Sequence, residues 1–186
     1  MANTAEDFEN ALVFVYSKYG DLITKTSVSA YDPDEKYIDV AEGLDSIEPK
    51  TRLQLLVVHR NGANEFSGIF ETGIPGGFRV LIYDEHQRDV RVSVRRTINA
   101  TAVISDMVTE SETGTFDEPL PVMIENMSTT GVLVKSGRTR MDIGALLQIE
   151  LRVDERTGIL YGEVLREQRL ADGTFGYGCK LYFFNK

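Results

Sequence analysis

The chain of 186 residues has little of the chemistry on which most enzymes and metal sites depend. It holds one cysteine, Cys179, and two histidines, His59 and His86. A single cysteine cannot form an internal disulfide, so nothing in the sequence indicates an oxidising compartment. A metal site needs several His, Cys or carboxylate side chains at close spacing, and neither histidine stands in a recognisable pattern with a nucleophile. The sequence therefore predicts no catalytic residues, no metal and no cofactor.

The sequence also lacks segments that would place it in a membrane or on a polyanion. The N-terminal segment has no basic start of the kind found in secretory signals, and its apolar run is short and interrupted. The net charge of −9 argues against a protein that coats nucleic acid or an anionic membrane. We therefore expect a cytoplasmic protein that binds no nucleic acid and does not insert into a membrane.

The charges that are present are unevenly distributed. Residues 1–84 carry 7 Lys/Arg and 14 Asp/Glu, whereas residues 85–186 carry 13 and 15. Four of those 13 basic residues lie between Arg88 and Arg96. A local basic cluster in an acidic protein fits the capture of one small anion better than a general polyanion surface.

Near the N-terminus, the spacing of apolar residues predicts an amphipathic helix from Thr4 to Tyr19. Thr4 and Asp7 resemble a capping box, and Gly20 is a natural helix end. One face would be buried, either against its own domain or against a partner or second copy. The residues at helical spacing are Phe8, Leu12, Val15, Tyr16 and Tyr19.

The rest of the chain is predicted to be strands. In the first half, the turn dipeptide Asn61-Gly62 between two apolar runs predicts a hairpin. Many short strands with regular turns in the second half predict a small barrel or sandwich. The acidic stretch 105–119 is interpreted as a long hairpin loop. We predict three regions: a β-rich N-terminal domain at 1–84 with one helix, a linker at 85–96, and a β-rich domain at 97–186.

Two short motifs carry the chemistry. The first is Arg91-x-x-x-Arg95, followed directly by Arg96, and the second is Asn126-x-Ser128-x-x-Gly131 on a turn between two apolar runs. Guanidinium groups bind phosphate oxygens and the O6/N7 edge of guanine through paired hydrogen bonds. An amide can match a base edge, a hydroxyl can donate to a phosphate, and glycine permits close backbone approach. A ligand with guanines and phosphates would use all of these groups.

Together these motifs resemble the PilZ domain family of bacterial cyclic-di-GMP receptors. The resemblance covers residues 86 to 186, and the closing stretch 'GYGCKLYFF' looks like the last strand of the family's barrel. It implies a six-stranded antiparallel β-barrel after the linker. It also implies that cyclic-di-GMP binds at these motifs. The predicted ligand-binding residues are Arg91, Arg95, Arg96, Asn126, Ser128 and Gly131. Residues 1–84 resemble the N-terminal barrel of YcgR-like flagellar brake proteins.

The resemblance implies a receptor and adaptor without enzymatic activity. Its partner would be a protein, such as a component of the flagellar motor or of a polysaccharide or pilus system. The alternative is a PilZ-like protein-interaction module that has lost its ligand. The sequence leaves open a homodimer and the number of ligands, although Val90, just before Arg91, offers no charge to a second dinucleotide and favours one.

Overall fold

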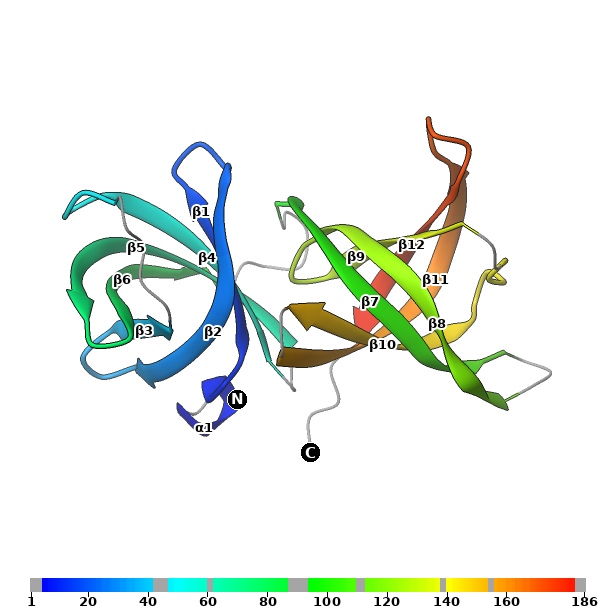
Figure 1. Ribbon diagram of the computed structural model, residues 1–186, viewed down its shortest axis with the longest axis horizontal. Coiled ribbons are helices and arrows are strands. Elements are labelled where there is room, and N and C mark those ends of the chain that lie inside the picture. Colours follow the sequence, from blue (N-terminus) through cyan, green and yellow to red (C-terminus); the bar gives the residue numbers. More distant parts are fainter. Residues whose placement is uncertain are drawn as a thin grey trace. The chain divides into compact units, whose positions relative to one another are not determined.

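The computed structural model shows a chain built almost wholly of strands in the ranges that it describes. The chain divides into two units, residues 1–91 and 92–186, and each unit holds one closed antiparallel barrel of six strands (Figure 1). This confirms the predicted mainly β fold with a six-stranded C-terminal barrel. The described ranges are 5–41, 47–59, 62–86, 94–109, 113–137, 140–153 and 156–182.

The N-terminal barrel begins with a single turn of helix and closes in the strand order β1-β2-β3-β6-β5-β4. Its hairpin β4–β5 is the one predicted from Asn61-Gly62, because His59 pairs with Gly62 across the turn. The elements are α1 (Ala5–Phe8), β1 (Leu12–Ser17), β2 (Leu22–Asp32), β3 (Tyr37–Ala41), β4 (Arg52–His59), β5 (Gly62–Ile74) and β6 (Gly77–His86).

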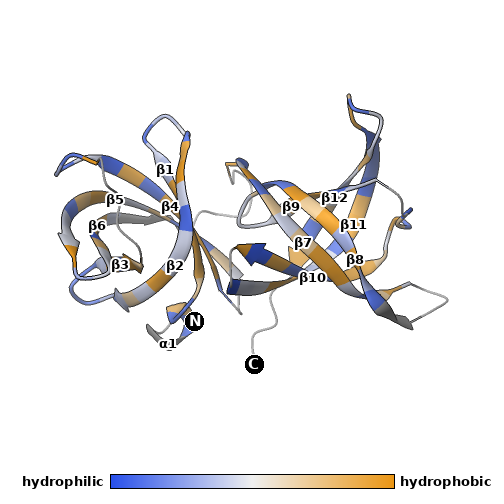
Figure 2. Ribbon diagram, in the orientation of Figure 1, coloured by the Kyte–Doolittle hydropathy of each residue, from blue (hydrophilic) through white to orange (hydrophobic). Residues whose placement is uncertain are grey.

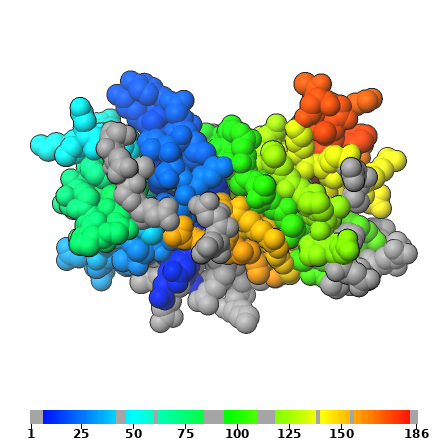
Figure 3. Space-filling model, viewed as in Figure 1, coloured from blue at the N-terminus to red at the C-terminus, as the bar shows by residue number. Residues whose placement is uncertain are grey.

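The C-terminal barrel has the same strand topology. Two three-stranded meanders, β7–β9 and β10–β12, close on each other through the pairs β7–β10 and β9–β12, just as β1–β4 and β3–β6 close the first barrel. The hairpin β11–β12 projects from this barrel (Figure 1, and orange in Figure 3). The strands are β7 (Arg96–Val108), β8 (Thr113–Met127), β9 (Gly131–Ser136), β10 (Leu146–Val153), β11 (Arg156–Arg169) and β12 (Phe175–Tyr182).

In β7, side chains alternate between the interior of the barrel and its outer face. Along β7, Ile98, Ala100, Ala102 and Ile104 are buried and the residues between them are more exposed. This period of two is what a half-buried strand requires. Figure 2 shows the resulting mixture of orange and blue along most strands.

The predicted helix from Thr4 to Tyr19 is wrong. Only Ala5–Phe8 is helical among the described residues there, and Leu12–Ser17 forms strand β1. Every side chain from Leu12 to Tyr16 is buried, so the segment has no polar face that a surface helix would expose. Aromatic and β-branched residues in a short, wholly apolar run favour a strand buried on both sides.

The acidic stretch 105–119 is also more regular than the sequence suggests. Strands β7 and β8 stay paired as far as Val108 and Thr113, so the described parts of this stretch extend the hairpin. The register shifts between Ile104 and Asp106, which is a bulge. Bulges let a long hairpin bend away from the barrel wall.

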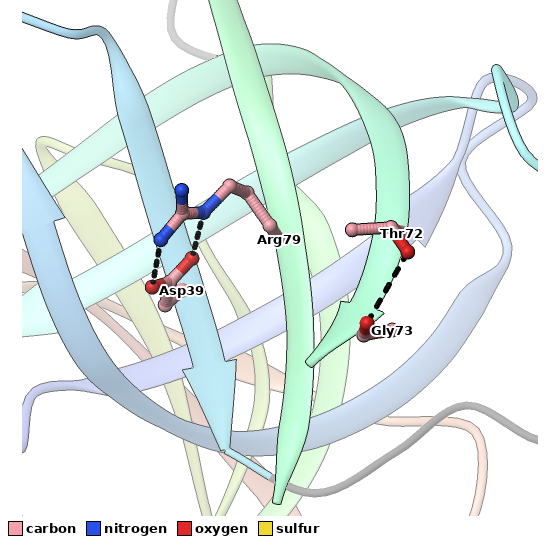
Figure 4. A network of polar contacts seen from close by, with 4 residues as sticks. All are labelled: Asp39, Thr72, Gly73 and Arg79. Atoms are coloured by element: carbon pink, nitrogen blue, oxygen red, sulfur yellow. Dashed lines mark hydrogen bonds and ion pairs between the residues drawn. The ribbon is translucent and has the colours of Figure 1, made fainter. Parts of the chain in front are cut away.

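An ion pair ties β3 to β6 on the N-terminal barrel. The Arg79 guanidinium donates from Nε and Nη2 to the two Asp39 carboxylate oxygens, each at 2.7 Å (Figure 4). The same guanidinium lies 3.7 Å from the centroid of the Tyr37 ring. The hydrogen bond that Arg79 donates to Asp39 raises the pKa of Arg79 above its usual value. Figure 4 also shows the Thr72 hydroxyl donating to the Gly73 carbonyl at 3.2 Å.

No helix in the described part of the chain is long and apolar enough to cross a membrane.

Candidate ligand-binding site

The start of β7 lies beside the end of β8. In the antiparallel register, Arg96 stands opposite Met127 and Thr97 stands opposite Asn126. The segment that follows the Arg91-x-x-x-Arg95 motif is therefore hydrogen-bonded to the strand that enters the Asn126-x-Ser128-x-x-Gly131 turn. The strand pairing thus brings the residue that follows Arg95 next to the strand that enters the second motif.

The arginines at this corner face different surroundings. Arg95 and Thr97 are exposed, whereas Arg96 between them is only 9% exposed and pairs with the buried Met127. Since successive side chains in a strand point to opposite faces, Arg95 precedes β7 on the side where Thr97 and Asn126 lie. Arg91 lies outside the described residues.

Ser128 shapes the turn from within. Its backbone N–H donates to the Gly131 carbonyl at 2.8 Å, and its hydroxyl donates to the same oxygen at 3.4 Å. The hydroxyl also accepts from the Thr130 N–H at 3.4 Å. The residue is only 2% exposed. These contacts hold the loop in place. The direct contact of the Ser128 hydroxyl with a ligand stays a prediction from the sequence.

Gly131 lies where the turn meets the closing strand of the barrel. A Cβ at this position would stand 3.1 Å from the Cys179 carbonyl oxygen on β12, which is closer than most side chains come to a backbone atom. One residue earlier, the Thr130 carbonyl accepts from the Leu181 N–H at 3.0 Å. Glycine thus permits the close approach that fastens the turn to β12.

Lys180 adds a positive charge beside the Asn126–Gly131 turn, and no sequence motif indicated it. It stands opposite Gly131 in the β9–β12 register and is exposed. Its ammonium lies 4.8 Å from the centroid of the Tyr182 ring. The alternation of 'GCKLY' could have placed Lys180 on the outer face, but only the register brings it next to the turn.

Comparison with known proteins decides which family this barrel represents. Residues 85–184, more than half of the chain, match the PilZ domain. The chain belongs to the PilZ domain family. No curated protein matches the sequence.

Several solved structures resemble the chain at low sequence identity. The K. pneumonia MrkH–c-di-GMP complex is 12% identical with a TM-score of 0.40, over 95% of this chain and 80% of that one. The Bacillus subtilis inhibitor of motility, MotI/DgrA, is 12% identical with a TM-score of 0.39, over 100% and 91%. Escherichia coli YcgR in complex with c-di-GMP is 9% identical with a TM-score of 0.39, over 93% and 76%.

The remaining candidate residues are structural in the described parts. In the PilZ barrel, Cys179 is buried, and this burial raises the pKa of its thiol to about 12, so it is a core residue and not a reactive thiolate. In the N-terminal barrel, His59 is buried and its Nε2 lies 2.7 Å from the Asn64 Oδ1. Among the described residues, no group of three or more His, Cys, Asp or Glu side chains could hold a metal ion.

Proposed function

We propose that this protein is a cyclic-di-GMP receptor that binds its ligand at the corner formed by the start of β7 and the β8–β9 turn. The observation that carries the proposal is the pairing of Thr97 with Asn126, which sets the exposed Arg95 beside the second motif. Membership of the PilZ domain family, whose members are non-enzymatic cyclic-di-GMP receptors, supports the same ligand and the predicted absence of enzymatic activity.

The corner offers each kind of group that a cyclic dinucleotide of guanine requires. The forked guanidinium of Arg95, joined by Arg91, suits a phosphate or a guanine O6/N7 edge. The Asn126 amide can pair with a base edge, and Lys180 adds positive charge beside Gly131. We assign Ser128 to holding the turn and Arg96 to anchoring the start of β7, and both support the contacts made by Arg95.

The ligand would also act on the connection between the two units. The Arg pair belongs to the predicted linker 85–96, whereas the second motif belongs to the PilZ barrel. A ligand that contacts both would restrain the linker and select one arrangement of the two units. A protein partner, such as a component of the flagellar motor or of a polysaccharide or pilus system, would recognise that arrangement.

Calorimetric titration tests the ligand and the site together. We expect saturable binding of cyclic-di-GMP to the wild-type protein, none of GTP, and a loss of affinity of about ten- to a hundred-fold in Arg95→Ala. Arg140→Ala is a matched control because Arg140 has an 85% exposed side chain and follows the end of β9, whereas the candidate site lies at its start.

The result of the titration distinguishes a cyclic-di-GMP receptor from a PilZ-like interaction module that binds no ligand. Equal affinity in Arg95→Ala and Arg140→Ala would move the site away from this corner. Absence of any heat, together with an unchanged melting temperature at saturating cyclic-di-GMP, would favour the ligand-free interaction module instead.

The change in arrangement has its own test. Spin labels at Tyr19→Cys and Ile143→Cys, two highly exposed positions in different units, report the distance between the units. The native Cys179 is buried and should resist labelling. We expect cyclic-di-GMP to narrow or shift the distance distribution. An identical distribution with and without bound ligand would contradict the adaptor mechanism but not ligand binding.

A further inference from the structure

A hollow of about 710 Å³ lies on the outer face of the C-terminal barrel, away from the two motifs in sequence. It is formed by four strands and by the turn that precedes β10. Its lining residues are Asp106 and Val108 from β7, Gly144, Leu146, Leu147 and Gln148 from the β10 region, Tyr161, Gly162 and Glu163 from β11, and Tyr182 from β12.

The strand register shows that Leu146 and the two tyrosines of the hollow point outward. Leu146 stands opposite Val108 on one side and opposite Glu163 on the other. Leu147, the next residue, is buried in the barrel, so Leu146 faces away from the core. By the same pairing Tyr161 joins Tyr182 on the outer face. The floor of the hollow is therefore the outside of the sheet.

The lining combines apolar surface with negative charge. Val108 and Leu146 are 37% and 48% exposed, and two tyrosine rings lie beside them. Asp106 and Glu163 are the charged residues of the lining, and none of the lining residues is basic. Single exposed aliphatic side chains are ordinary on a surface, but here they share a concave site with two carboxylates.

Hydrogen bonds hold parts of the lining in place. The Tyr182 hydroxyl donates to the Glu163 carboxylate, and the Gln148 amide donates to the Ser105 hydroxyl at 2.9 Å. Both bonds join neighbouring strands. A site whose polar groups are held by their neighbours loses little conformational freedom when a ligand binds.

The edge of the hollow already holds a cation against an aromatic ring. Lys180 stands opposite Glu163 in the β11–β12 register, and its ammonium lies 4.8 Å from the Tyr182 ring centroid. The electron-rich face of a tyrosine ring attracts a positive charge within about 6 Å. Because Lys180 already lies against this ring, Asp106 on β7 is the carboxylate of the lining that we expect to receive the positively charged group of a ligand.

We propose that this hollow binds a small organic cation that carries an apolar or aromatic body. Its two carboxylates disfavour phosphates, so the site is distinct in chemistry from the corner proposed for the dinucleotide. Its volume falls in the range of roughly 300–1,000 Å³ typical of small-molecule sites. A protein partner would need a contact of about 800 Å² on each side, which is far more surface than a single hollow supplies. This inference does not rest on the proposed function.

Matched probes of similar size test the proposal on the full chain. We choose 2-phenylethylammonium, the neutral 2-phenylethanol and the anionic 3-phenylpropionate, and we follow backbone amide shifts. The cation should shift the amides of Leu146, Tyr161 and Glu163 and bind at least about three-fold more tightly than the alcohol. The anion should bind more weakly than both, and added salt should reduce the preference for the cation.

Two variants locate the source of that preference. Asp106→Asn and Glu163→Gln keep the shape of the hollow and should reduce the cation's advantage over the alcohol, whereas Glu9→Gln, an exposed carboxylate of the other unit, should leave it unchanged. Equal binding of cation and alcohol, shifts elsewhere in the chain, or an unchanged preference in both variants would each overturn the proposal. Binding of a Leu-Arg-Leu peptide without binding of 2-phenylethylammonium would also overturn it and assign the hollow to a protein.

Discussion

The two barrels share one strand topology but differ at the equivalent corner. In the C-terminal barrel, the first strand begins at Arg96, next to the turn that follows Met127, and Arg95 is exposed there. In the N-terminal barrel, the first strand begins at Leu12, beside β2, and no arginine precedes it. The same arrangement of strands therefore places arginines before the first strand in one barrel and none in the other.

The N-terminal corner is filled and acidic. The ring centroid of Phe8 in α1 lies 4.5 Å from that of Tyr31 and 4.8 Å from that of His59. The turn after β2 is built on Asp32, whose Oδ1 accepts from the N–H groups of Asp34 and Glu35, each at 2.9 Å. A carboxylate-rich turn repels an anion. Strand topology alone therefore does not make a binding site. The side chains at the corner determine whether it can bind an anion.

The largest predicted effect is a loss of stability, and it distinguishes a glycine of the N-terminal barrel from a glycine of the C-terminal barrel. A Cβ at Gly77 would stand 1.9 Å from the Val40 carbonyl oxygen, so Gly77→Ala should destabilise the N-terminal barrel by about 3 kcal/mol or more. At Gly131 the distance to the Cys179 carbonyl oxygen is 3.1 Å, so Gly131→Ala should cost less stability, and the shift of the turn away from β12 should weaken ligand binding. Thermal unfolding and calorimetry measure the two. Gly77→Ala unfolding like the wild type would contradict the close contact.

The second prediction separates the charge of Arg95 from its shape. Arg95→Lys keeps the charge but loses the planar fork, so its affinity for cyclic-di-GMP should fall between the wild type and Arg95→Ala, whose loss is about 1.5–3 kcal/mol. Titration of the three proteins at one salt concentration measures this order. If Arg95→Lys binds as tightly as the wild type, the ligand needs only a positive charge at residue 95 and not the planar guanidinium.

A smaller effect is expected at Ser128. Its hydroxyl is buried in the turn, so Ser128→Ala should lower the free energy of unfolding by about 0.5–1.5 kcal/mol. It should weaken ligand binding less than Arg95→Ala does. Urea unfolding and titration of the same sample give both numbers. An affinity loss as large as that of Arg95→Ala would mean that the hydroxyl contacts the ligand itself.

The smallest effect concerns pH and the β11–β12 hairpin. The Lys135 ammonium and Thr174 hold the pKa of Asp172 well below its usual 3.8. A lowered carboxyl pKa stabilises the folded state above the usual pKa and loses that contribution as the pH falls below it. Asp172→Asn should therefore be slightly less stable than the wild type at pH 7, and the difference should shrink as the pH falls below 3.8. A difference that grows towards acid would contradict this sign.

The sequence predicted strands well where polar and apolar residues alternate, as in β7, and where a turn dipeptide separates two runs, as between β4 and β5. It failed at Leu12–Tyr16, because apolar residues at helical spacing also occur in a strand buried on both faces. The bounds of the linker 85–96 stay a prediction, since residues 87–93 lie outside the described ranges.

The candidate site could be predicted in part. Its motif residues are visible in the sequence, but their pairing depends on a register with shifts at Thr97–Ala100 and Ile124–Asn126, which no sequence pattern reveals. For the same reason the sequence did not indicate Lys180 or the hollow beside Tyr182. Those groups come together only when the barrel closes through β12.

The most direct test of the account is an amide shift map of the full chain titrated with cyclic-di-GMP. Because the two barrels share a topology, the equivalent corner of the N-terminal barrel is an internal control. We expect the shifts to concentrate at Arg95–Thr97 and Asn126–Gly131, with residues 32–36 unchanged. Shifts at residues 32–36, or saturable binding that leaves both motifs unchanged, would contradict the claim that the motif residues and not the barrel make the site.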